Sequence, residues 1–389
     1  MIIIYTIWIL LSIQNWLNDQ QTKKDIIPNL KLLECSNKKA IKLSDLASES
    51  RLVKLETKDS SLIGRDSRYI VGSKYIICIT RSNILQFDSN GGFIRNVAQT
   101  GRGPGEFVNI TGVDIDKEEK NLFFTSSNSK MIQKVDLNTE KFSTPISIAK
   151  GGLSACKIVI LKDKIAVFPT ITDNEGFLVC YQDLFGKYIE GIPVKYKRVP
   201  QLKIRADRSL LSQGNNIYYF EPMICGDTIF QISTINKTPM MIVNGGEDFG
   251  HSNDDPTGYI TLLLSKSKDT WIFANQLIEI KNNTLKLGDV HYYTVEGKDS
   301  ELSEITQFTL DNLGKTYSFE ELKAGFLTTS LSVDLAREQF VFKIESIEFK
   351  KIVADNKMTV PENELTKIKR LDKEISIYDN PVLLIGKLK

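Results

Sequence analysis

The chain has 389 residues, of which 41% are hydrophobic and 25% are charged. This is ordinary globular composition, with ample material for a large core. The 50 Lys and Arg residues nearly balance the 48 Asp and Glu residues, and the net charge of +2 excludes a strong bias toward nucleic acid or an anionic membrane surface. We therefore expect no nucleic-acid partner.

The chain begins with an apolar stretch, Ile2–Ile13, which Thr6 and Ser12 interrupt. It is too short to span a bilayer comfortably and resembles the hydrophobic part of a secretory signal. No Lys or Arg precedes it, however, and no A-x-A cleavage site follows, so an uncleaved or misassigned start is the alternative. We expect an exported protein in the periplasm or at the outer membrane, with residues 1–47 as a signal-like or flexible segment.

The five cysteines do not predict a disulfide framework or a zinc site, because their number is odd and no C-x-x-C pair occurs. Cys78 and Cys180 lie in apolar, strand-like runs, which predicts buried thiols. Cys35 is a candidate for lipid attachment, and this would be the protein's membrane contact. Glu34 precedes it and a polar segment separates it from the apolar stretch, so lipidation stays an alternative.

From about residue 50 the chain consists of short strand patterns bounded by turn residues. Ile84–Asp88 is followed by Asn90-Gly91, a hairpin signal in which both central residues are expected to have positive φ. Similar units recur along the chain. The aligned positions Phe87, Val135, Tyr181, Ile232 and Ile280 are separated by roughly 46 to 51 residues, the range of a four-stranded propeller blade.

Both ends of the chain contain strand candidates that would close such a ring. A closed ring leaves only short sheet edges, and closure usually needs one blade built from both chain ends. Arg51–Leu55 alternates near the start, and Pro381–Leu388 is an apolar strand at the end. A helical pattern at Glu362–Ile375 and a weaker one at Phe319–Ala324 are predicted as excursions from the last blade.

The glycine-rich segment Gly101–Phe107 is similar to a phosphate loop at first sight. Its third glycine comes one residue too early for G-x-G-x-x-G, and the G-K-[ST] ending of a phosphate loop is absent. An alternating strand follows, so no helix N-terminus is offered to a phosphate. We predict a structural connection anchored by Phe107, in which Arg102 and Glu106 pair within the loop or face a ligand.

With Val113–Asp116, this segment resembles the loop-and-strand signature of six-bladed β-propeller proteins abundant in Bacteroidetes, which are similar to NHL-type propellers. Three further regions agree with the resemblance: Leu55–Thr57 with Ser61–Gly64, Tyr218–Pro222 with Gly226–Phe230, and Asp379–Leu383. The resemblance runs from about residue 50 to the C-terminus. It implies an all-β, six-bladed propeller over residues 48–389, in exported and often lipid-anchored proteins, and it carries over no catalytic set.

Few residues suggest chemistry. His251 lies in a polar loop and His291 in an aromatic-rich strand, and both are interpreted as surface residues. Asn253–Asp255 offers oxygen atoms for calcium but lacks the spacing of a calcium loop. Asp114 and Asp116 share one strand face, where aspartates before a turn are common. We predict no catalytic residue and no metal ligand.

The sequence favours a non-enzymatic binding or scaffold protein of the cell envelope. Three observations favour this hypothesis: the repeated strand units, the missing catalytic constellation and the near-neutral charge. Loops gathered at one face of a ring would bind an unknown protein or glycan, with Arg102 and Glu106 as the candidate ligand-binding residues, and we expect a monomer without cofactor. The alternative is a propeller hydrolase or lactonase with a metal such as calcium in the central channel.

Overall fold

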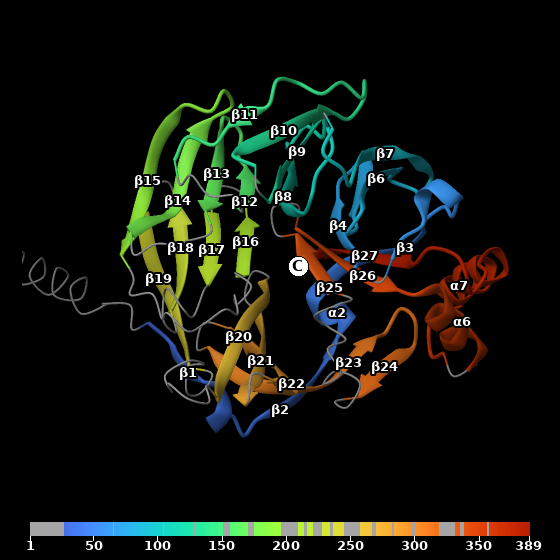
Figure 1. The fold of residues 1–389 in the computed structure, drawn as a ribbon. Helices are drawn as coiled ribbons and strands as arrows, with labels where there is room; N and C mark the ends of the chain where they lie inside the picture. The colour runs from blue at the N-terminus through green and yellow to red at the C-terminus, as the bar shows by residue number, and fades with distance from the viewer. Residues whose placement is uncertain are drawn as a thin grey trace, which may run out of the picture.

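The computed structural model shows a ring of six antiparallel sheets around a central axis (Figure 1). It describes residues 27–64, 66–103, 105–127, 129–150, 156–169, 175–195, 209–213, 216–220, 228–233, 236–244, 257–266, 270–281, 284–297, 300–318, 331–334, 338–355 and 358–389. The predicted all-β, six-bladed propeller is confirmed.

Each blade contains four antiparallel strands, numbered from the axis outward, which are consecutive in the chain in blades 1 to 5. Blades 1 to 3 are built from β4 (Arg68–Val71), β5 (Tyr75–Ile79), β6 (Asn83–Asp88) and β7 (Phe93–Gln99); β8 (Ile110–Ile115), β9 (Asn121–Ser126), β10 (Met131–Asp136) and β11 (Ile146–Ser147); and β12 (Cys156–Ile160), β13 (Lys164–Pro169), β14 (Glu175–Asp183) and β15 (Tyr188–Lys195). Blades 4 to 6 are built from β16 (Ser209–Gln213), β17 (Asn216–Phe220), β18 (Thr228–Ser233) and β19 (Asn236–Asn244); β20 (Thr257–Lys266), β21 (Thr270–Lys281), β22 (Thr284–Glu296) and β23 (Glu301–Leu310); and β25 (Leu331–Asp334), β26 (Gln339–Ile344), β27 (Val382–Leu388) and β3 (Ala47–Lys54). A short strand, β24 (Lys315–Ser318), pairs with the end of β23.

Blade 6 closes the ring with both chain ends, as predicted. Its outermost strand, β3, comes from the N-terminal part of the chain and pairs antiparallel with the C-terminal strand β27. The register joins Lys54 to Val382 and Arg51 to Ile385. The backbone hydrogen bonds of one sheet therefore fasten the two chain ends together.

Residues before β3 form a belt, which we define as residues 28–46, around blades 4 and 5. β1 (Asn29–Lys31) adds a parallel strand to β19, and β2 (Lys38–Lys42) adds one to β23. The short helices η1 (Leu32–Glu34) and α2 (Leu43–Leu46) connect these strands to each other and to β3. The folded unit thus extends back from residue 48 to the start of β1.

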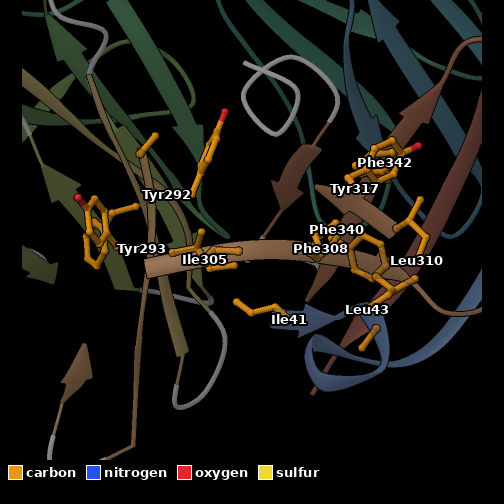
Figure 2. Close-up of a cluster of buried hydrophobic side chains, with 14 of the residues drawn as sticks. Ile41, Leu43, Tyr292, Tyr293, Ile305, Phe308, Leu310, Tyr317, Phe340 and Phe342 are labelled. Atoms are coloured by element: carbon orange, nitrogen blue, oxygen red, sulfur yellow. The ribbon is translucent and has the colours of Figure 1, made fainter. Parts of the chain in front are cut away.

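The belt is fastened by apolar side chains as well as by backbone pairing. Leu32, Ile41 and Leu43 are at most 3% exposed and belong to the same core cluster as blades 4 to 6. Figure 2 shows Ile41 and Leu43 beside Phe308 and other side chains of blade 5. Burying three large aliphatic side chains stabilises the belt by roughly 1.5 to 3 kcal/mol each.

Two helices are inserted between the second and third strands of blade 6, at the outside of the ring (Figure 1). α7 (Glu362–Glu374) confirms the predicted helix, with Ile368 fully buried and the neighbouring Leu365 and Leu371 partly buried. α6 (Ser346–Ala354) was not predicted. The second predicted helical stretch, Phe319–Ala324, lies outside the described residues.

The hairpin at Asn90-Gly91 forms, but with a different turn from the predicted one. Only Gly91 has a positive φ, of 92°. The Asp88 carboxylate accepts the N–H groups of Asn90 and Gly92 at 2.7 and 3.0 Å, and Asp88 and Gly92 pair through their backbones. The side chain of Asp88 therefore shapes a three-residue loop that needs one left-handed residue instead of two.

The predicted repeat is correct for the third strands of blades 1, 2 and 4 and shifted elsewhere. In blade 3, Gln182 and not Tyr181 corresponds to Phe87, because Asp183 ends its strand as Asp88 does. Both residues are buried, so the hydrophobic pattern did not reveal the register. The copy at Ile280 lies in β21, the second strand of blade 5, because the strands of this blade are unusually long.

Candidate functional site

The two faces of the ring carry connections of different length. Because the strands of a blade are antiparallel, the links between blades and between second and third strands lie on one face, which we call the connection face. The remaining turns lie on the opposite face, which we call the turn face. The connection between β26 and β27 on the connection face contains the helices α6 and α7, whereas turns of the turn face are as short as residues 72–74 and 161–163.

Aspartates close the turns of the turn face on their own backbone. Asp88 and Asp183 each accept two N–H groups of the hairpin that follows. Asp116 and Asp136 do the same in blade 2. These N–H groups lower the pKa of Asp136. The carboxylates serve as turn caps, which leaves the connection face as the candidate binding face.

The glycine-rich loop connects blade 1 to blade 2 and packs against the rim of blade 2. Phe107 is 1% exposed and packs edge-on against Phe124, as predicted for an anchor. Gly105 has a φ of 78°, and a Cβ atom there would lie 2.7 Å from the ring of Phe142. The glycine is therefore required both by its left-handed backbone and by the close approach to Phe142.

The side chains of Arg102 and Glu106 do not pair, although the Arg102 backbone N–H donates to the Glu106 carboxylate. The Glu106 carboxylate accepts the backbone N–H of Gly103 at 2.7 Å and the Gln99 amide at 3.3 Å. The Gly103 N–H, followed by the Gln99 amide, lowers the pKa of Glu106. A Cβ atom on Gly101 would collide with this carboxylate. The Arg102 side chain is exposed, so of the two candidates Arg102 is the one directed to solvent.

A buried layer of side chains runs around the ring at the fourth and fifth residues of the second strands. The fourth residue faces the preceding blade and the fifth faces the following blade, which produces one pair at each of the six junctions. Four of these pairs share a core cluster: Ile79–Phe124, Phe168–Tyr219, Phe220–Phe273 and Ala274–Phe342. At the other two junctions the same positions hold Thr125 with Val167 and Lys343 with Cys78. Lys343 is the one charged residue at these positions, and it shares the junction of blades 6 and 1 with Cys78, which packs against Val341 on the same face of β26.

Lys343 and Cys78 belong to a polar network that we call the closing-junction network: Ser67, Tyr69, Cys78, Lys343 and Glu345. The Tyr69 hydroxyl lies 2.9 Å from Ser67 Oγ and hydrogen-bonds the Cys78 thiol. Lys343 Nζ lies 3.0 Å from Glu345 Oε1. Lys343 is 6% exposed and Cys78 is fully buried, whereas Ser67 and Glu345 are partly exposed. The network thus leads from the interior to the surface.

The hydroxyl and thiol of this network keep their protons at neutral pH. Burial raises the pKa of Cys78 to about 12, although the hydrogen bond to Tyr69 and the charge of Lys343 act in the opposite direction. Burial also raises the pKa of Tyr69 well above its usual value, and the negative charge of Glu345 adds to this. Both groups therefore act as hydrogen-bond donors and not as bases.

A second polar centre joins the two ends of the propeller. Asn380 is 3% exposed, and its side chain accepts the Ile63 N–H at 3.0 Å and donates to the carbonyls of Glu56 and Ser61 at 2.8 Å each. Its carbonyl accepts the Ser346 hydroxyl at 2.6 Å. The opening and closing segments that carried the family resemblance therefore meet at this one asparagine.

The other polar candidates have structural roles or lie outside the described residues. Asp114 accepts the N–H of Ile160 in blade 3 at 2.8 Å, which joins two inner strands. His291 Nδ1 lies 3.0 Å from Glu304 on a partly exposed strand surface. His251 and Asn253–Asp255 are not described. Among the described residues, no group of three or more His, Cys, Asp or Glu residues could hold a metal ion.

No disulfide joins the cysteines that the structure describes. Cys78 and Cys180 are buried, as predicted. Cys35 lies in the belt, and its thiol points to the carbonyls of Asn37 and Leu302 at 3.4 and 3.7 Å. Lipid attachment at Cys35 would require removal of residues 1–34, including the buried Leu30 and Leu32. In the described part of the chain, no helix is long and apolar enough to cross a membrane.

Comparison with known proteins agrees with this architecture. A family model described as a domain of unknown function, DUF4934, matches residues 27–387. The chain belongs to this family. The match begins just before the belt and ends in the closing strand β27, so the family unit coincides with the described ring. A comparison with curated proteins gave no match.

Two solved structures from Bacteroides are similar to this DUF4934 chain. One, from Bacteroides fragilis, is a protein inferred to be exported; it is 16% identical, with a TM-score of 0.59, and the alignment covers 91% of this chain and 99% of that one. The other belongs to the DUF4221 family of Bacteroides vulgatus and is 10% identical, with a TM-score of 0.48 and coverages of 88% and 97%. The first likeness supports the fold. The NHL-like and lipoprotein features of the predicted resemblance stay predictions.

Proposed function

We propose that this protein is a non-enzymatic binding propeller of the cell envelope that engages a protein or glycan through its connection face. The observation that carries the proposal is the contrast between the faces. Several turns of the turn face are closed by carboxylates bound to their own backbone, whereas the connection face carries the glycine-rich link and the inserted helices. Long connections held on a rigid ring are the usual place for binding residues.

Export supports the envelope location. The apolar start resembles a secretory signal, and the similar Bacteroides fragilis protein is inferred to be exported. Arg102 lies on a link of the connection face and is exposed, so it is the candidate ligand-binding residue with an available charge. Glu106 supports the shape of the loop beside it through the Gly103 N–H.

A pull-down from envelope extracts tests the proposal. Wild-type protein is expected to enrich a partner, and R102E is expected to reduce this enrichment. K162E is the matched control, because Lys162 is an exposed cation in a short turn of the turn face. Equal loss with both variants, or no enrichment above an unrelated propeller, would contradict binding through the connection face.

A further inference from the structure

We propose that the closing-junction network is a binding site for a carboxylate group at the connection face. This deepens the proposed function, since it names a ligand class for the same face. The site comprises Ser67, Tyr69, Cys78, Lys343 and Glu345, between blades 6 and 1.

The position of the site follows from strand direction. Lys343 is the penultimate residue of β26, and Glu345 follows that strand at its connection-face end. Tyr69 is the second residue of the innermost strand β4 and pairs with Cys78 in β5. Ser67 precedes β4 on the link from blade 6. The network therefore opens on the face that the proposed function uses, close to the inner strands of the ring.

The repeat acts as an internal control for the chemistry of this site. Where blade 6 has Lys343, the other blades have Ile79, Thr125, Phe168, Phe220 and Ala274. Where blade 1 has Cys78, all the other blades have an aromatic residue or a valine. Packing at this layer therefore does not require a charge. A buried cation is costly to desolvate, and departures from a local rule concentrate at functional sites.

The donors of the network determine the ligand class. Lys343 is a cation, and Ser67, Tyr69 and Cys78 carry protonated hydroxyl or thiol groups, whereas Glu345 is the one carboxylate. Arg68 and Arg81 are exposed at the same end of blade 1, with Asp66 bound to Arg81 at 2.5 Å. Among the described residues named here, three cations thus stand against two carboxylates, which pair with Lys343 and Arg81. An incoming carboxylate gains charge-assisted hydrogen bonds here, while a neutral ligand gains fewer.

Titration of the full chain with small carboxylates tests the site. Glucuronate represents an acidic sugar, N-acetylglutamate represents an acidic peptide side chain, and glucose is the uncharged control. Calorimetry is expected to show saturable binding of at least one carboxylate, weakened by added salt, and none of glucose. The tighter of the two carboxylates identifies the source. Absence of saturable binding for both would overturn the proposal.

K343M separates binding from packing. Methionine keeps most of the side-chain volume and leaves Glu345, which is partly exposed to water, without its partner, so the thermal midpoint is expected to fall slightly while affinity falls roughly tenfold or more. K164M is the matched control, because Lys164 is a partly buried lysine of blade 3 that lies 3.5 Å from Glu190. Y69F, which keeps the ring and removes one donor, gives a second reading and is expected to weaken binding roughly threefold or more. Unchanged affinity in a folded K343M or Y69F protein would refute the site.

The same variants distinguish this proposal from the proposed function. If the wild-type protein enriches a partner but binds neither carboxylate, the carboxylate site is wrong and face binding stands. If it binds a carboxylate through Lys343 but enriches no partner, the carboxylate site is supported and the proposed binding of an envelope partner is contradicted.

Discussion

The junction between blades 3 and 4 and the junction between blades 6 and 1 occupy the same layer of the ring with opposite chemistry. At the first, the rings of Phe168 and Tyr219 stack with centroids 6.0 Å apart. At the second, Lys343 and Cys78 occupy the same positions, and polar contacts lie beside them: Tyr69 with Ser67 at 2.9 Å and Lys343 with Glu345 at 3.0 Å. Apolar contacts tolerate any sequence of the right volume, whereas a buried polar network requires each partner in place. The junction of blades 3 and 4 therefore depends on the volume of its apolar side chains, whereas the junction of blades 6 and 1 depends on the identity of its polar residues.

The largest expected effect is at the apolar junction. Phe168 is fully buried, so F168A leaves a cavity in the core and removes the stacking contact with Tyr219. We expect it to lower the free energy of unfolding by about 4 kcal/mol. Urea denaturation measures this. F185A is the control, because Phe185 is 91% exposed and is expected to change stability by less than about 0.5 kcal/mol. A similar loss in both variants would show that the apolar junction does not contribute more to stability than an exposed aromatic residue does.

The next effect concerns the belt. A chain that starts at Cys35 lacks β1 and the buried Leu30 and Leu32, and is expected to lose about 3 kcal/mol relative to a chain that starts at Ile27. Thermal or urea unfolding of the two chains gives the difference. Mass spectrometry of the exported protein is expected to find its first residue at or before Ile27. A mature, lipid-modified Cys35 would contradict this.

At the closing blade, N380A sharpens the comparison. It leaves the partly buried N–H of Ile63, the partly buried carbonyl of Glu56 and the buried carbonyl of Ser61 without their partner, and we expect a loss of about 3 kcal/mol. N96A is the matched control, since Asn96 is exposed and bonds only the Asn83 side chain at 2.9 Å among the described residues. A loss in N380A no larger than in N96A would show that closure does not depend on this polar centre.

The smallest effect concerns Glu119, which joins blade 2 to blade 1. Burial pushes its pKa up, but the N–H groups of Lys74, Ser73 and Tyr75 outweigh this and lower it. Because the pKa of Glu119 is lower in the folded state than in the unfolded state, its carboxylate stabilises the folded protein at pH values above the unfolded-state pKa. This stabilisation is lost as the pH falls through the folded-state pKa. E119Q is expected to cost about 1 to 2 kcal/mol at pH 7.

The difference between E119Q and the wild-type protein should shrink as the pH drops below about 4. Urea titrations at several pH values between 3 and 7 measure it. A difference that stays constant across this range would mean that the carboxylate charge is not what joins the two blades.

Several particular features were predictable because they depend on local pattern. Strand alternation and turn residues predicted the repeated blades, and apolar periodicity predicted α7. The two end strands were predictable because a ring needs closure. The belt was not, since its short strands Asn29–Lys31 and Lys38–Lys42 exist only through parallel pairing with blades 4 and 5. α6 was missed because its nine residues follow directly on a strand.

The closing-junction network was not predicted, although a signal for it was present. Aligned by their first residues, the second strands show Cys78 and Lys343 as departures at the fourth and fifth positions. The predicted repeat was instead anchored on the third strands of the blades, and its position in blade 3, Tyr181, is one residue away from the true equivalent, Gln182. Arg102 and Glu106 were predicted from their spacing alone, and the fold decided that Glu106 bonds the Gly103 N–H and leaves Arg102 exposed.

By itself, the sequence determined the all-β class, the blade spacing, the closing strands and the structural role of the glycine-rich segment, because each follows from backbone preferences within a few residues. The tertiary structure alone decided which distant residues meet. Lys343 and Cys78 lie in different repeats, far apart along the chain, and only ring closure places them at one junction. The same closure brings Asn380 to Glu56, Ser61 and Ile63. Local pattern carries no information about such contacts, since they depend on how many blades the ring contains and where it closes.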